Sequence, residues 1–294
     1  MISPREALAA VGQLADVEID IAGAALQFAR IDAPGANWRA TEAHLSDLAR
    51  QANDGVRDGE QDGPSAGLPA GLKSRAACIA GLLGAHRYTG DTENYDDPAN
   101  ANLIRVVERR RGLPVALGVL WLHCARALGW TAHGIDFPGH FLIALAPEPR
   151  GPRARHRPAT AQQLVIDVFA GGVPLEADDL RTLLRHVAGS SAELGPGVLQ
   201  PMSARRVLLR LQENLRVRRL RGDDMAGALA ATEDMLLIAP DNAGLWREAA
   251  VMSERLERPA AAIASWQRFV DLVPNHEASA QARAAIDALR GRLH

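Results

Sequence analysis

The chain has 294 residues, 47% of them hydrophobic, and a formal net charge of −2. This length and apolar content exclude a disordered chain and suffice for two ordinary domains. The near-neutral charge lacks the basic excess of nucleic-acid-binding proteins, so no nucleic-acid partner is expected. Two cysteines are too few for a disulfide framework and favour a reducing compartment. Since no secretory signal and no long uncharged apolar run occur, we expect a cytoplasmic protein without membrane association.

The first part of the chain reads mainly as helices. Between 17 and 52 apolar residues recur at helical spacing on both sides of a Pro-Gly break. The stretch 54–67 is rich in Gly and Asp, offers almost nothing to bury, and predicts a loop. Helical spacing returns in 70–87. A second polar loop, 91–102, then leads into the apolar segment 103–129.

The hydrophobic period changes after this segment. Three short β-rich or apolar stretches bounded by Gly and Pro predict strands at 130–136, 140–145 and 163–169. The Pro/Arg-rich stretch 147–161 between the last two predicts a surface loop; its positive charges would either be solvated or meet an acidic partner. Helices followed by a small antiparallel sheet make an α+β domain, which we place at 1–190, with a linker at 189–198.

The remaining segment, 202–294, reads as helical throughout and contains an internal repeat. Like residues recur 34 positions apart, at Ala228 and Ala262 and at Pro240 and Pro274. Trp246 opens the second unit and Trp266 lies on its second helix. A small residue lets paired helices approach closely, and a proline stops the helix before it. The segment therefore resembles the tetratricopeptide repeat, and the resemblance implies a protein or peptide partner.

Two repeats are fewer than a solenoid needs to stand alone. We therefore expect them to lean on a flanking helix, 205–220, or on the first domain. The alternative is an unrelated helical bundle with an accidental period.

The stretch DFPGHFLIAL, 136–145, places one histidine at the mouth of a buried strand. His140 is either a catalytic base on a rigid scaffold or a core histidine with satisfied nitrogens. Upstream, Gly112 ends one helix and Pro114 begins the next, where a first-turn proline is tolerated. That next helix is apolar nearly all round and should be buried. Downstream, Asp167 lies within the third predicted strand.

The order helix start, His, Asp is that of the Cys-His-Asp triad in the transglutaminase-like superfamily. The motifs ERRRGLPVALGVL, FPGHFLIAL and IDVFAGG, followed by the repeats, resemble the SirB family of transglutaminase-like proteins over roughly residues 15–285. The resemblance implies a papain-like, transglutaminase-like core fused to repeats, with His140 and Asp167 as catalytic partners. Two positions depart from the family pattern: Ala116, where a hydroxyl residue is common, and Val168, where proline is common.

A transglutaminase nucleophile would fall at Pro114, whose side chain cannot act as one. Cys124 lies ten residues further along the helix, a rise of about 15 Å, and reads as a packing cysteine. Cys78 lies on an earlier predicted helix. His140 and Asp167 therefore predict two-thirds of a triad without its nucleophile.

Other motifs predict neither cofactor nor metal. The histidines at 123, 133, 140, 156 and 186 show no paired ligand spacing, and no glycine-rich phosphate loop follows a strand. The arginines at 109–111 are either an anion site, members of ion pairs, or a solvated helix end.

Two functional hypotheses follow. The first is a non-catalytic transglutaminase-like protein that binds a protein or peptide through its domain and repeats. The second is a hydrolase or acyl transferase that uses His140 and Asp167 with water or a non-standard nucleophile such as Cys78.

Overall fold

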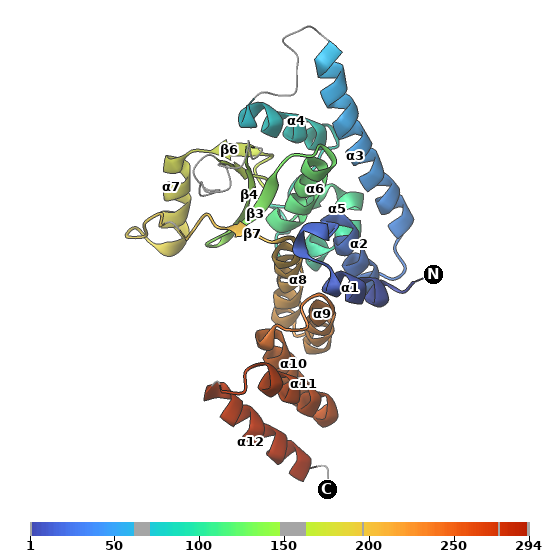
Figure 1. The fold of residues 1–294 in the computed structure, drawn as a ribbon, viewed down its shortest axis with the longest axis vertical. Coiled ribbons are helices and arrows are strands. Elements are labelled where there is room, and N and C mark those ends of the chain that lie inside the picture. The colour runs from blue at the N-terminus through green and yellow to red at the C-terminus, as the bar shows by residue number, and fades with distance from the viewer. Residues whose placement is uncertain (1, 62–70, 148–162, 196, 276, 293–294) are drawn as a thin grey trace. The chain divides into compact units, whose positions relative to one another are not determined.

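The computed structural model describes residues 2–61, 71–147, 163–195, 197–275 and 277–292 (Figure 1). The chain forms two compact units. The sheet unit comprises Asp16–Leu208, and the repeat unit comprises Met1–Ala15 together with Leu209–His294. The architecture is α+β followed by helices, as the sequence predicts.

The sheet unit begins with helices. Their bounds are η1 Asp16–Glu18, α2 Ile21–Asp32, α3 Trp38–Gln61, α4 Leu72–Ala85, η2 Pro98–Ala101, α5 Leu103–Arg109 and α6 Pro114–Ala127. Two short strands, β1 Thr89–Gly90 and β2 Arg111–Gly112, pair in parallel beside them. In the described part of the chain no helix is long and apolar enough to cross a membrane.

The loop predicted for 54–67 is wrong in its first part, because α3 continues to Gln61. That stretch holds no proline before Pro64, and Arg50 pairs with Asp54 one turn away at 3.7 Å. A helical turn can form without apolar residues, so the lack of apolar residues in this stretch did not indicate a loop. Residues 62–67 lie outside the described residues.

Helix α6 is the buried centre of this unit, as its composition predicts. Eleven of its fourteen residues are buried, Pro114 among them. A Cβ at Gly118 would stand 2.3 Å from Phe141 Cε1, so the glycine lets the helix approach the following strands closely.

Five strands form the main sheet in the order β6-β5-β4-β3-β7, all antiparallel. Their bounds are β3 Ala132–Phe137, β4 His140–Leu145, β5 Leu164–Asp167, β6 Val173–Leu175 and β7 Pro201–Met202. One face packs on α7 (Ala177–Ala188) through a core that includes Ile135, Leu142 and Leu184. Figure 1 shows α6 and α7 flanking these strands. The loop expected at 147–161 lies, apart from Pro147, outside the described residues.

The segment 189–198, expected as a linker, also contributes side chains to the core of the sheet unit. Ala192, Leu194 and Val198 pack against the core beneath α7, and the chain then returns to the sheet as β7. The sheet unit therefore extends past 190 to Leu208, within α8 (Ala204–Arg221).

The repeat unit consists of paired helices. Besides the second half of α8, they are α1 Pro4–Gln13, α9 Met225–Ile238, α10 Ala243–Arg255, α11 Pro259–Leu272 and α12 Glu277–Gly291. Ala228 and Ala262 are both fully buried. Helices α9 and α11 end immediately before Ala239-Pro240 and Val273-Pro274, as the repeat pattern predicts.

The N-terminal helix α1 packs on α9, although the sequence-based boundary assigns it to the first domain. Arg5 Nε donates to Asp234 Oδ1 over 2.8 Å, and the Asp234 side chain is only 8% exposed. A helix supplied by the chain's other end thus covers the first repeat, which two repeats alone would leave exposed.

Candidate functional site

His140 and Asp167 lie together at one end of the main sheet. His140 Nε2 stands 3.3 Å from Asp167 Oδ2, and the two side chains are 20% and 17% exposed. An ionised carboxylate only accepts hydrogen bonds, so Nε2 carries the proton. Among the described residues, His140 Nδ1 has no hydrogen-bond partner. The hydrogen bond predicted from the sequence is present, and it leaves Nδ1 available to a ligand.

A tight hairpin turn fixes the position of His140. Phe137 pairs with His140 across β3 and β4, so only Pro138 and Gly139 form the turn. Gly139 has φ +67°, a conformation that side chains disfavour and that a proline-glycine turn requires at its third position. A Cβ at Gly139 would also stand 2.4 Å from Val187 Cγ1. The PGH motif is therefore a local structural requirement for placing the imidazole.

Asp167 holds a second turn as well as the imidazole. Its Oδ1 accepts hydrogen bonds from the backbone N–H of Phe169 at 2.9 Å and of Ala170 at 3.2 Å. Burial alone would raise the pKa of the Asp167 carboxyl, but the hydrogen bonds from His140 and this turn outweigh it and lower the pKa. The carboxylate is therefore ionised at neutral pH.

The helix start opposite these strands offers no nucleophile. Pro114 is the first residue of α6, and α6 packs on β4 through Gly118 and Phe141. Cys124 is fully buried, and burial raises its pKa to about 12. Burial also raises the pKa of Cys78. An activated thiolate needs a lowered pKa, so neither thiol has the character of a nucleophile.

Residues 39–213 match the transglutaminase-like superfamily, and residues 215–290 match a tetratricopeptide repeat. The first match covers more than half of the chain and includes Pro114, His140 and Asp167. This chain belongs to the transglutaminase-like superfamily. A transglutaminase-like domain joined to tetratricopeptide repeats supports a protein-interaction module.

Relatives of this transglutaminase-like chain occur in bacteria and in animals. A UPF0162 protein of Xylella fastidiosa (strain Temecula1) is 30% identical over 209 residues, covering 70% of this chain and 68% of the relative. One from Vibrio cholerae is 29% identical over 202 residues, covering 69% and 70%. Human F-box only protein 21 is 28% identical over 108 residues, covering 35% of this chain and 16% of that protein. No solved structure is significantly similar to the chain.

Three exposed apolar side chains lie on or against segments next to the His-Asp pair of the transglutaminase-like unit. Val173 is the β-ladder partner of Asp167, and Val187 contacts Gly139 beside His140. Tyr95 stacks edge-on against Phe169, in the turn that Asp167 holds. Their exposed fractions are 49%, 45% and 44%. We call these three residues the apolar rim; sequence reasoning missed it because they come from three segments distant in the chain.

Of the other histidines named from the sequence, those that the structure describes form no metal site. His123 and His133 each make one hydrogen bond, to a backbone carbonyl and to a glutamine side chain. His186 is exposed on α7, and His156 lies outside the described residues. Within the described parts of the chain, no three His, Cys, Asp or Glu side chains are arranged to hold a metal ion.

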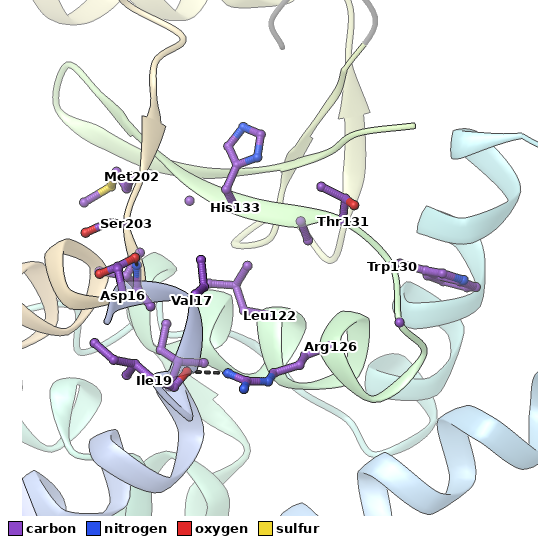
Figure 2. A pocket seen from close by; sticks show the side chains of 16 residues that line it. Asp16, Val17, Ile19, Leu122, Arg126, Trp130, Thr131, His133, Met202 and Ser203 are labelled. Atoms are coloured by element: carbon purple, nitrogen blue, oxygen red, sulfur yellow. Dashed lines mark hydrogen bonds between the residues drawn. The ribbon is translucent and has the colours of Figure 1, made fainter. Parts of the chain in front are cut away.

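A hollow of about 520 Å³ lies elsewhere in the sheet unit (Figure 2). Its lining includes residues 132–134, at the end of the β3–β4 hairpin opposite His140. Its charged side chains have internal partners. Asp16 accepts hydrogen bonds from the first N–H groups of α8, and Figure 2 shows Arg126 donating to the carbonyl oxygen of Ile19. The hollow is therefore separate from the His140–Asp167 pair.

Proposed function

We propose that this chain is a non-catalytic transglutaminase-like protein that binds a protein or peptide partner, in a regulatory role. The observation that carries the proposal is the incomplete triad. Asp167 accepts a hydrogen bond from the His140 imidazole, as the acid of a working triad does. A nucleophile is missing, because Pro114 occupies the helix start and the pKa values of both cysteines are raised. From the RRxGxP and PGHF motifs we further infer membership of the SirB family.

The apolar rim supports a peptide as the occupant of the sheet unit. Singly scattered apolar residues are normal on protein surfaces, so the proposal takes these three, each next to the His-Asp pair, as parts of one docking surface. A peptide segment with apolar side chains would cover the rim, and one of its backbone N–H groups would donate to His140 Nδ1. The repeats supply a second interaction surface, for which their superhelical stacking is suited.

The alternative is a hydrolase or acyl transferase with a non-standard nucleophile. The free Nδ1 of His140 favours it, because a general base needs an unoccupied nitrogen. Ester and amide hydrolysis and amine transfer to a glutamine-containing peptide, measured for wild type and His140→Ala, separate the two functions. We expect no turnover that depends on His140; turnover abolished by His140→Ala would establish the enzyme instead.

Binding is tested with peptides selected from a random library on the wild-type protein. Val173→Lys should weaken the selected peptides by about tenfold or more, because it places a charge in the rim. Val17→Lys is the matched control, since Val17 is 86% exposed on η1, away from the rim. Equal binding to wild type and Val173→Lys would contradict the rim as the docking surface.

A further inference from the structure

A polar cluster lies at the junction of α3, α4 and α5, apart from the His140–Asp167 pair. Arg110 Nη1 stands 2.6 Å from His44 Nε2 and also donates to the hydroxyl of Tyr88. The Arg110 guanidinium lies over the Tyr88 ring, 4.9 Å from its centroid. His86 meets the His44 ring edge-on at 5.2 Å, and its own Nε2 contacts Gln51. Two imidazoles and a phenol thus surround one guanidinium.

Arg110 differs from both of its neighbours in the ERRRG motif. Arg109 forms ion pairs with two carboxylates, one of them the buried Asp91, and Arg111 pairs with Glu93 at 2.6 Å. Arg110 has no carboxylate partner among the described residues. Its backbone is left-handed, with φ 59° and ψ 21°, a conformation costly for arginine that directs its side chain away from those carboxylates. The motif therefore provides two structural arginines and one without a counter-charge.

The two side chains that contact Arg110 Nη1, those of His44 and Tyr88, are neutral at pH 7. Burial, with Arg110 and His86 nearby, lowers the pKa of His44 to about 4. Burial raises the pKa of Tyr88 to about 12. The acid whose charge opposes this lowering of the His44 pKa is Asp47, which is exposed and accepts a hydrogen bond from Arg50 at 2.8 Å. Tyr88 can still donate its hydroxyl proton, since no acceptor for it occurs among the described residues.

We propose that Arg110, His44, His86 and Tyr88 form a binding site for a tetrahedral oxyanion, such as a sulfate or phosphoryl group. The Arg110 guanidinium and the Tyr88 hydroxyl can donate there, and His44 can donate once it is protonated. Donors from different elements suit a ligand with three or four acceptor oxygens better than a carboxylate. His44, His86 and Arg110 are each partly exposed, so a small anion can reach the site.

Anion binding at this site is coupled to proton uptake by His44. In the empty site His44 Nε2 must accept from Arg110, so it is unprotonated. An anion placed between them accepts from both Arg110 and a protonated His44, and its charge stabilises the imidazolium. The groups facing His44 are Arg110, His86, Tyr88 and Asp47; of these, only Asp47 favours the proton in the empty site. Linkage then requires the affinity to rise as the pH falls.

Sulfate is the better probe, because it does not titrate between pH 5 and 8. Isothermal titration calorimetry of the full chain should show saturable sulfate binding that tightens by up to about tenfold per pH unit, the limit for one coupled proton. Phosphate and a phosphate monoester, compared at one pH, distinguish a free anion from an esterified one. Imidazole NMR of the same samples should show the His44 pKa rising when sulfate is added.

Matched variants decide whether Arg110 is responsible. Arg110→Asn removes the charge with a residue that tolerates the left-handed backbone, and should weaken sulfate about tenfold or more. Arg111→Gln removes a neighbouring charge and should leave affinity unchanged. His44→Gln should abolish the pH dependence; far-UV circular dichroism confirms that each variant is folded. Absence of saturable binding, equal loss in Arg111→Gln, or unchanged affinity in Arg110→Asn would overturn the proposal.

Discussion

At the scale of single residues, Asp167 has two separable roles: it orients His140 and it caps the turn before β6. Asp167→Ala removes both and strands the imidazole, so we expect a loss of about 1–3 kcal/mol in unfolding free energy. Asp167→Asn keeps an oxygen for the turn N–H groups and should cost less. Urea unfolding of both variants measures the difference, with Asp287→Ala as the exposed control. No loss in Asp167→Ala would contradict a mutually satisfied pair.

His44 makes stability depend on pH. Its pKa is lowered to about 4 in the folded protein from an ordinary 6.5, so the unfolded chain binds the proton more readily. The stability is therefore complete above the unfolded pKa and declines as the pH falls from 6.5 towards 4. Because the ring is partly solvated, we expect a loss of only about 1 kcal/mol by pH 5.

Urea unfolding at pH 7.5 and pH 5, in buffers without sulfate or phosphate, tests this dependence. His44→Gln should reduce the difference between the two pH values. His186→Gln, at an exposed histidine, should leave it as in wild type. An identical pH dependence in wild type and His44→Gln would contradict the assignment.

At the scale of elements, the repeats depend on close approach of α10 and α11 at Ala262. Ala262 is fully buried in a core that includes Ala250, Trp266 and Phe269. Ala262→Leu should overpack this core and cost about 1–3 kcal/mol, measured by chemical or thermal unfolding. Ala260→Leu, at an exposed position of the same helix, is the control. Equal melting temperatures for Ala262→Leu and wild type would show that the helix pair is not packed in this way.

Elements with a strong local signal were predictable from the sequence. The apolar run of α6, the Pro-Gly turn before β4 and the repeat prolines each determine structure through their immediate neighbours. The end of α3 and the short strands β6 and β7 were not predictable. Exposed helical turns lack an apolar period, and strands of two or three residues are defined by their partners in the sheet.

At the scale of the whole molecule, long-range contacts set the unit boundaries. Helix α1 joins the repeat unit through contacts such as Arg5–Asp234, which are 229 residues apart in sequence. Asp16 caps the start of α8 by accepting from Ala204 N–H at 2.8 Å. No local pattern indicates such pairings. The His140–Asp167 pair was predictable because the order of the sequence motifs matches that of the triad residues. The apolar rim was not predictable, because its residues meet only in the folded chain.

We propose that the transglutaminase-like unit holds an oriented imidazole without a nucleophile, because proline occupies the helix start. Pro114→Cys tests it most directly. The iodoacetamide alkylation rate of each thiol at neutral pH is measured by mass spectrometry, with and without His140→Ala. The proposed triad arrangement places the introduced thiol at a helix N-terminus beside the imidazole, and both lower a thiol pKa. The introduced thiol should therefore react faster than Cys78 and Cys124, and His140→Ala should slow it. The proposal would be contradicted if the introduced thiol reacted no faster than Cys78, or if His140→Ala left its alkylation rate unchanged.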